Sequence, residues 1–455
     1  MARDSSEAGP DMFSPSRRLT AALANPVLFP IAAGTAGFCA YFSMYAFRKP
    51  FTAATFAHVA GWDLSLDYKI ALVLAQVAGY ALSKFIGIKV VSEIHPRHRA
   101  AAIIGLIGTS WLALVMFALV PAPWNVAALF CNGLPLGMIW GLVYGYMEGR
   151  RVSELLAAML CGSFILSSGV VKSIGLWLMQ DIGVGPFWMP AATGVLFMPL
   201  LLLSVWVLNL LPPPSIRDEA ERVRREPMTA AERRRFLLAY APGLIAIVLG
   251  YVLLTAFRDY RDNFVAEIWK GLGFGGEAAI FSASELPVAI IALLGMAAVT
   301  MVRDNARALM VIHAMIGVGF ALIGLSTLAY QAHLLSPFVW MILAGSGLYL
   351  AYNPINAVLF DRLVAFSGQT ANAGFLIYVA DSCGYLGSVA VLLWRNFGEG
   401  ALDWLQFFIL GAYATSVIGV AATIVAALYF HRRSAGPSRT AREPAIDTAL
   451  REVIS

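Results

Sequence analysis

Apolar residues along this chain gather into long runs that short polar segments separate. Runs of about 20 residues, the length of a helix that crosses a bilayer, cover 26–47, 69–91, 100–120, 124–147, 153–180, 186–211, 237–258, 278–301, 307–330, 336–360, 371–394 and 403–431. Hydrocarbon offers backbone polar groups no partner, so each run is predicted to be a helix. The pattern therefore predicts an all-α integral membrane protein with twelve transmembrane helices.

The polar segments divide the chain into two halves of six helices. An N-terminal tail (1–25) precedes the first six-helix bundle (26–211), and a basic linker (212–236) leads to the second bundle (237–431). The final tail (432–455) is rich in Pro, Ser and Arg, a composition typical of disorder. The linker falls near the middle of the chain, where a protein of two such bundles needs one.

Basic residues are unequally distributed between the two sides of the predicted membrane. With these boundaries, 22 of the 32 Lys and Arg lie in the tails and in the loops on the side of the termini, against 7 on the opposite side. Positive residues accumulate on the cytoplasmic side of a membrane. We therefore expect a multi-pass protein of the cell (cytoplasmic) membrane with both termini in the cytoplasm.

The composition excludes several classes of function. Hydrophobic residues make up 59% of the chain and charged residues 13%, whereas soluble domains carry about 25% charged residues. The net charge of +5 does not indicate nucleic acid, because the excess lies in loops between apolar helices. The sequence contains no G-x-x-x-x-G-K-[ST] nucleotide loop and no H-E-x-x-H zinc motif. We expect no enzyme activity, and transport would draw on a gradient rather than on ATP.

The cysteines give no sign of a metal site. All four lie inside apolar runs and none forms a C-x-x-C pair (Cys39, Cys131, Cys161 and Cys383). They are expected to pack between helices. No metal and no other cofactor is predicted.

The two halves share short motifs at a nearly constant offset. Ala46-Phe47-Arg48 reappears as Ala256-Phe257-Arg258, 210 residues later, and Gly133 recurs as Gly345, 212 residues later. Two related six-helix bundles joined by a linker form the major facilitator fold, in which the substrate binds between the halves near mid-depth. The repeat therefore predicts this fold and a central site.

Glycines recur at every fourth position of the run 124–147, at Gly133, Gly137, Gly141 and Gly145. Such a stripe lets two helices approach closely. The spacing fits either a face that permits rocking between states or tight static packing.

Four further motifs point to a particular family. They are Tyr45-Ala46-Phe47-Arg48-Lys49-Pro50-Phe51, Tyr80-Ala81-Leu82-Ser83-Lys84-Phe85-Ile86, Tyr251-Val252-Leu253 and Gly384-Tyr385-Leu386-Gly387. Together they resemble signatures of the organophosphate:phosphate antiporters of the major facilitator superfamily, which carry glycerol-3-phosphate and hexose phosphates. The resemblance implies a secondary transporter for an organic anion that bears phosphate, working as a monomer in the bilayer.

The resemblance transfers some residue roles and not others. In those carriers a first-helix arginine and a seventh-helix arginine clamp the phosphate, and the first corresponds to Arg48. The second corresponds to Leu254, and Arg258 lies four residues further on. A family histidine on the fifth helix corresponds to Ser163, and Lys172 is the charged residue of that helix.

Two arginines are the leading candidates for substrate binding. By the repeat, Arg48 and Arg258 face one another, with Tyr45 beside the first. The planar arginine fork pairs with both oxygens of a carboxylate or phosphate, which suits an anion clamp. The alternative is that both arginines extend to the lipid headgroups, because about 22 residues of helix already span the hydrocarbon.

Two further charges lie within apolar helices, Lys172 and Asp381. A charge at mid-bilayer costs roughly 2.5–3.5 kcal/mol, so it normally faces a cavity or a partner. The repeat places Asp381 within a turn of Lys172, so the two are predicted to approach one another. Asp381 would then be a proton-coupling site, the pair a latch between the halves, or the pair purely structural.

Other polar residues are weaker candidates. The cluster that contains Asp259 and Arg261 is expected to neutralise itself at an outer gate. Glu285 is expected to interact with the start of its helix. Five residues are expected to line the cavity: Tyr45, Gln76, Asn132, Asn353 and Asn356.

We therefore predict a secondary active transporter that moves a small organic anion by alternating access. The alternative is a transporter-like sensor that binds a ligand without moving it, since the antiporter family includes such sensors. A lipid-handling enzyme would need clustered acids at one membrane face, and the cytoplasmic loops offer only scattered ones (Glu93, Glu148, Glu154 and Asp361).

Overall fold

The structure is a computed structural model that describes residues 25, 27–147, 152–213, 230–367, 373–398 and 402–434. Within these ranges the regular secondary structure is helical. Twelve of the helices are long and apolar enough to cross a membrane. The prediction of twelve transmembrane helices is therefore confirmed.

The N-terminal half contains six of these helices. The first two are followed by short 3₁₀ turns, η2 (Pro50–Ala53) and η3 (Pro96–His98), and the fourth breaks into two pieces near Pro135. Its elements are α2 (Leu28–Tyr45), α3 (Tyr68–Glu93), α4 (Arg99–Leu119), α5 (Asn125–Leu136), α6 (Ile139–Tyr144), α7 (Ser153–Gln180) and α8 (Met189–Asn209).

The C-terminal half contains the other six. A π-helical turn, η4 (Ile355–Leu359), follows Pro354, because proline cannot donate the regular helical hydrogen bond. The elements are α10 (Ala230–Asn263), α11 (Val265–Gly271), α12 (Ala279–Thr300), α13 (Asn305–Gln331), α14 (Pro337–Pro354), α15 (Phe360–Ser367), α16 (Ala373–Phe397) and α17 (Trp404–Ser434).

The predicted helix ends lie within a few residues of these bounds except in two helices. The tenth span continues through η4 and α15 to Ser367, beyond the predicted end at 360, and α10 ends at Asn263, beyond the predicted end at 258. Helix α10 begins at Ala230, within the segment 212–236 that was expected to be linker. Its first turns are rich in Glu and Arg, so a search for apolar runs does not find them. The tails 1–24 and 435–455 and most of the linker lie outside the described residues.

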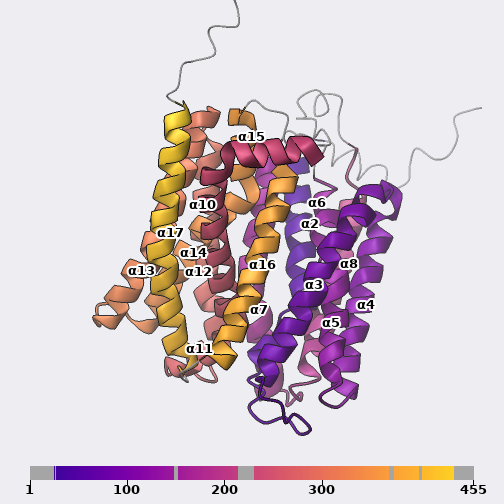
Figure 1. Ribbon diagram of the computed structural model, residues 1–455. Coiled ribbons are helices and arrows are strands. Elements are labelled where there is room, and N and C mark those ends of the chain that lie inside the picture. Colours follow the sequence, from indigo (N-terminus) through magenta and orange to yellow (C-terminus); the bar gives the residue numbers. More distant parts are fainter. Residues whose placement is uncertain are drawn as a thin grey trace, which may run out of the picture.

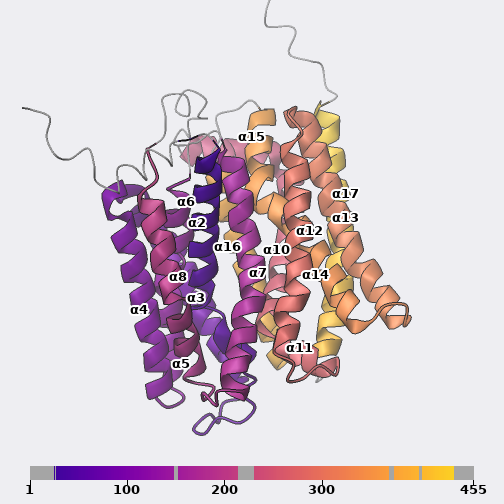
Figure 2. The same ribbon diagram turned by 180° about the vertical axis from the view of Figure 1, so that it is seen from behind.

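The two halves stand side by side (Figure 1). Helix α2 begins and α17 ends at the same end of the bundle, which we call the terminal side, and we call the opposite end the far side. Figure 2 shows the bundle from behind, where α7 lies alongside α12 at the boundary between the halves. The boundary has a second seam, between α3 and α16.

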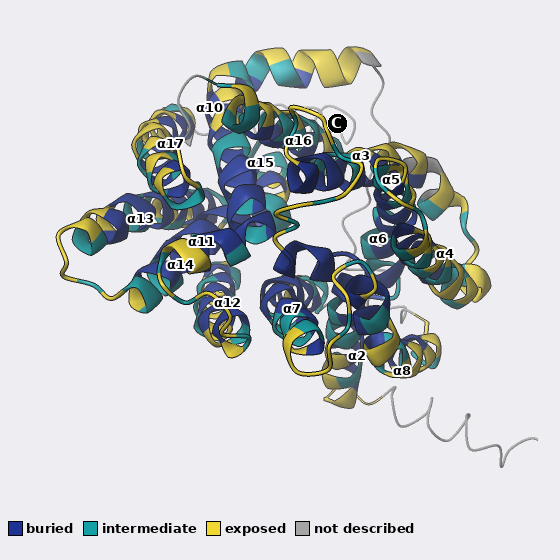
Figure 3. Ribbon diagram, turned by 90° about the horizontal axis from the view of Figure 1, so that it is seen from below, coloured by how far each residue is buried: buried dark blue, intermediate teal, exposed yellow. Residues whose placement is uncertain are grey.

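The outer faces of the helices are apolar and exposed. Leu112, Val195 and Leu325 are 58%, 51% and 64% exposed. Seen along the bundle axis, exposed positions lie on the periphery and buried ones between the helices (Figure 3). An apolar periphery around twelve spanning helices is the surface of a multi-pass membrane protein.

The glycine stripe on the fourth helix packs against a helix of its own half. A Cβ added at Gly133 would lie 2.2 Å from the carbonyl oxygen of Gln76, and one at Gly79 would lie 2.2 Å from that of Phe130. The backbones of α3 and α5 therefore meet directly. Of the two interpretations of the stripe, this contact favours static packing.

Candidate functional site

A cavity of about 350 Å³ lies between the two halves. The N-terminal half lines it from α2, α3, α6 and α7, and the C-terminal half from α10, α14, η4, α15 and α16. It extends to the terminal side, where Val91, Tyr144 and Asp361 line it. Its polar and aromatic lining residues include Tyr41, Tyr45, Arg48, Tyr80, Lys84, Arg258, Tyr352, Asp381 and Tyr385.

Arg48 is a buried cation on the wall of this cavity. It follows the end of α2, is 7% exposed, and its guanidinium lies 3.9 Å from the centre of the Tyr80 ring and 5.8 Å from that of Tyr45. Among the described residues no carboxylate pairs with it, and its Nε has no hydrogen-bond partner. The alternative that Arg48 extends to the headgroups is therefore wrong.

The backbone around Arg48 is fixed by two amide side chains. Gln76 Nε2 donates to the carbonyl oxygen of Arg48 at 2.9 Å and to Asn132 Oδ1 at 2.7 Å. Asn132 Nδ2 donates to the carbonyl oxygen of Phe47 at 2.9 Å. These bonds satisfy carbonyls that the end of α2 leaves without helical partners. Gln76 and Asn132 were expected to line the cavity, and they instead hold the turn that presents Arg48.

Arg258 lines the same cavity from α10, but its charge has a partner. Its Nη2 lies 2.8 Å from Asp259 Oδ1, and its Nη1 donates to the hydroxyl of Tyr352. Asp259 Oδ2 also accepts a hydrogen bond from Ser388 at 2.9 Å. Arg258 is therefore held in place within its own half, whereas Arg48 keeps an uncompensated charge.

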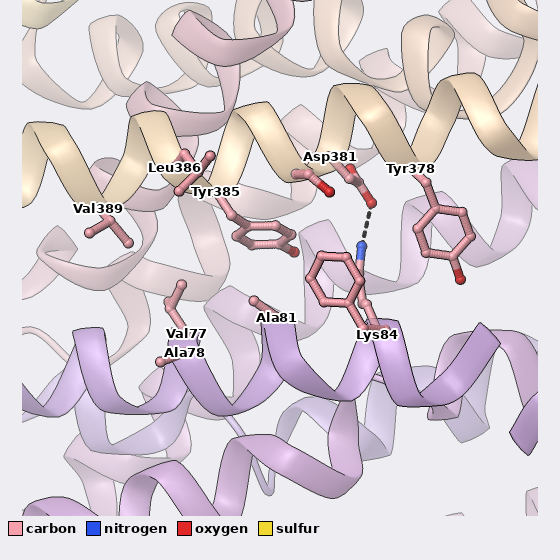
Figure 4. A pocket seen from close by; sticks show the side chains of 11 residues that line it. Val77, Ala78, Ala81, Lys84, Tyr378, Asp381, Tyr385, Leu386 and Val389 are labelled. Carbon is pink, nitrogen blue, oxygen red and sulfur yellow. Dashed lines mark hydrogen bonds and ion pairs between the residues drawn. The ribbon is translucent and has the colours of Figure 1, made fainter. Parts of the chain in front are cut away.

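Asp381 joins the two halves at the cavity wall. It accepts a hydrogen bond from Tyr251 within its half, and it forms an ion pair with Lys84 of α3 (Figure 4). Sequence reasoning did not single out Lys84. The sequence feature that could have identified Lys84 is the one that identified Lys172, a charged residue inside an apolar run.

The expected pairing of Lys172 with Asp381 is wrong. Lys172 Nζ lies 2.6 Å from Asp262 Oδ1 and also donates to Ser168 Oγ at 2.9 Å. Helix α7 packs against α12, whereas α16 lies beside α3, so Lys172 and Asp381 belong to opposite seams of the molecule. The repeat shows that two positions correspond, but corresponding positions need not touch.

Three lysines of the N-terminal half meet two carboxylates of the C-terminal half on the far side. Lys49 Nζ lies 2.5 Å from Asp262 Oδ2, and Lys69 Nζ lies 2.6 Å from Glu267 Oε1. Lys172 is the third lysine, and all three side chains are 5% exposed or less. We call these five residues the gate network. It joins the two halves on the far side.

Burial opposes the charge of two groups in the gate network. Burial lowers the pKa of Lys49 to about 8, although Asp262 acts in the opposite direction. Burial also raises the pKa of Glu267, although Lys69 opposes this shift. Loss of hydration thus offsets much of the attraction within each pair, and separating the halves would return the charges to water. A contact with this balance suits a gate that opens and closes.

Three other predicted residues lie apart from the cavity wall. Arg261 pairs with Glu285 at 2.7 Å, a link between α10 and α12 within one half, so Glu285 does not act at the start of its helix. Asn353 and Asn356 were both expected to line the cavity; Asn353 is buried in α14 and does not line it, whereas Asn356 in η4 does.

Comparison with known proteins places the chain in a family. Residues 50–433 match a family of unknown function, DUF5690. The chain belongs to this family. No curated protein matches it.

Solved structures with a similar fold are membrane transporters. A D-xylose-proton symporter matches 88% of this DUF5690 chain and 96% of its own at 14% identity, with a TM-score of 0.59. The nucleoside transporter NupG matches 87% and 99% at 14% identity (TM-score 0.55). A peptide transporter, POT, solved in complex with sulfate, matches 92% and 99% at 14% identity (TM-score 0.58).

These matches confirm the predicted fold class, a twelve-helix major facilitator fold. At 14% identity they inform on fold alone. The resemblance to organophosphate:phosphate antiporters, and the roles it implies for Arg48 and Arg258, stay predictions.

Proposed function

We propose that this DUF5690 protein is a secondary active transporter that moves a small organic anion across the cytoplasmic membrane by alternating access. The observation on which the proposal rests is Arg48, a buried cation at the cavity wall without a carboxylate partner in the described part of the chain. An unpaired buried charge is strongly unfavourable. A bound anion would supply the missing counter-charge.

The surroundings of Arg48 suit an anionic group. Its guanidinium can donate two parallel hydrogen bonds to a carboxylate or phosphate. Tyr45 and Tyr80 add hydroxyl groups from the same half, and Arg258 approaches from the other. A ligand bound to both arginines would contact both halves, so its affinity would depend on how the halves are arranged.

The closed far side supports alternating access. The gate network joins the halves there, while the cavity extends to the terminal side. The excess of basic residues assigns the terminal side to the cytoplasm, so the conformation would be open to the inside. Opening the far side would require the lysines to leave Asp262 and Glu267.

Thermal stability of the purified protein tests the anion site. A ligand that binds only the folded state raises the melting temperature. Inorganic phosphate, phosphate esters and carboxylates are compared on the native protein, on Arg48→Ala and on a control, Arg307→Ala, which removes an exposed arginine outside the cavity. We expect one class of anion to stabilise the native and control proteins, and Arg48→Ala to lose at least tenfold in affinity.

Vesicles containing the purified protein then test transport. The stabilising anion should exchange across the membrane in the native protein and not in Arg48→Ala. Stabilisation without exchange would support the sensor instead. An effect of anions that is indifferent to Arg48 would refute the proposed site.

A further inference from the structure

The two seams between the halves differ in their packing. At the seam of α7 and α12 the helices are in close contact, since a Cβ added at Gly169 would lie 2.5 Å from the carbonyl oxygen of Phe281. At the seam of α3 and α16 the helices touch at few points and enclose an apolar cavity of about 300 Å³. We call this cavity the crevice. The internal repeat alone would make the two seams alike.

The crevice has walls suited to a hydrocarbon chain. On α3 it is lined by small side chains, Ala78 and Ala81, and on α16 by Leu386 and Val389 (Figure 4). Leu386 is 71% exposed, so the crevice opens on the outer surface of the bundle, which faces lipid. Along α3 it runs from Val77 to Phe85, about 12 Å at 1.5 Å per residue.

The crevice adjoins the central cavity, and the side chains that separate them belong to both walls. Four residues line both: Lys84, Tyr378, Asp381 and Tyr385. The ion pair of Lys84 with Asp381 stands where the two meet, and beyond it lies the wall that carries Arg48. A movement of this ion pair would let one molecule contact the arginine with one end and the apolar walls with the other.

We propose that the transported anion is amphipathic, with its charged head at Arg48 in the cavity and a hydrocarbon chain between α3 and α16. This inference rests on the proposed function and adds the chemical class of the substrate. A purely polar anion would make no use of the apolar walls of the crevice, which bilayer lipid would then fill. A chain there would also be released between the halves as α3 and α16 move apart, together with the separation of Lys84 from Asp381.

A series of alkyl phosphates tests the chain. Binding of ethyl, hexyl and decyl phosphate to the full protein in lipid nanodiscs is measured at known free concentrations in water. Burying one methylene should strengthen binding about threefold to fourfold. The gain in affinity per methylene should level off once the alkyl chain is longer than the crevice. Decanol, which has the chain without the head, should bind at least a hundredfold more weakly than decyl phosphate.

Two variants fill the crevice. Ala81→Phe narrows it from α3, and Leu386→Trp covers its mouth at an exposed position that tolerates a larger side chain. Both should lose the gain in affinity with chain length. The matched control Ala101→Phe, at an exposed position of α4 outside the crevice, should keep it.

The outcomes separate this inference from the proposed function. If ethyl phosphate binds in a manner that depends on Arg48 and longer chains add nothing, the inference is overturned and the proposed function stands. Decanol binding as tightly as decyl phosphate would mean that the crevice takes a bilayer lipid independently of the anion, which also overturns the inference. If no alkyl phosphate binds in a manner that depends on Arg48, the inference is overturned, and the thermal comparison that includes carboxylates decides the proposed function separately.

Discussion

Asp262 is the residue on which closure of the far side depends most. It pairs with Lys49 at 2.5 Å and with Lys172 at 2.6 Å, and so connects both lysines of the other half to α10. The substitution Asp262→Asn preserves shape and removes the charge. Two lysine side chains that are 5% and 3% exposed would then lack their counter-charge.

The expected magnitude follows from burial. Removing one partner of a buried ion pair costs about 3–5 kcal/mol. Opening the far side lets both lysines reach water, so the penalty applies to the closed form and less to the open form. Even about 3 kcal/mol corresponds to a shift of about a hundredfold toward the open form.

Distances between spin labels measure this equilibrium. In a background without the four native cysteines, one pair of labels replaces Asp63 and Glu277 on far-side loops, and another replaces Arg97 and Arg303 on the terminal side. Asp262→Asn should lengthen the far-side distance and shorten the terminal one. These opposite changes distinguish alternating access from local loosening.

A matched control comes from the same side of the molecule. Asp181 is an exposed carboxylate at the end of α7, outside the gate network, and Asp181→Asn should leave both distances unchanged. If Asp262→Asn also leaves both unchanged, the gate network does not hold the far side closed. If both distances lengthen, the halves separate without alternating.

Two further substitutions test the support of the site. Gln76→Leu leaves the carbonyl oxygen of Arg48 without its hydrogen-bond donor. We expect the protein to lose about 2 kcal/mol of stability and to bind anions more weakly. The control Gln406→Leu, at an exposed position, should change neither property. Gly133→Ala places a Cβ 2.2 Å from the carbonyl oxygen of Gln76 and should cost about 1–3 kcal/mol, whereas Gly105→Ala, with nothing within 4 Å, should be neutral or stabilising. Unfolding in denaturant checks both, and equal effects of variant and control would contradict either expectation.

The helices and the fold were accessible from the sequence because a bilayer imposes one simple requirement. A spanning helix must be apolar over about 20 residues, and that pattern needs no knowledge of tertiary contacts. The first turns of α10 were not predicted, because they are polar and a search for apolar runs does not detect them. The internal repeat located Arg48 and Arg258 at corresponding positions, and the structure shows both lining one cavity, each from its own half.

The partners of the charged residues were not accessible in this way. Which lysine meets which carboxylate depends on which helices flank each seam and on their relative depth. Lys84 meets Asp381 and Lys172 meets Asp262 because α3 lies beside α16 and α10 reaches α7 on the far side. Neither hydropathy nor residue spacing shows which helices become neighbours.

The sequence by itself determined the twelve helices, the two related halves and the corresponding positions of Arg48 and Arg258, since these follow from local hydropathy and an internal repeat. Only the tertiary structure decided that Arg48 has no carboxylate partner among the described residues, that the gate network joins the halves on the far side, and that one seam is packed while the other holds a crevice. Each of these depends on contacts between residues far apart in the chain, which are fixed only when the helices pack.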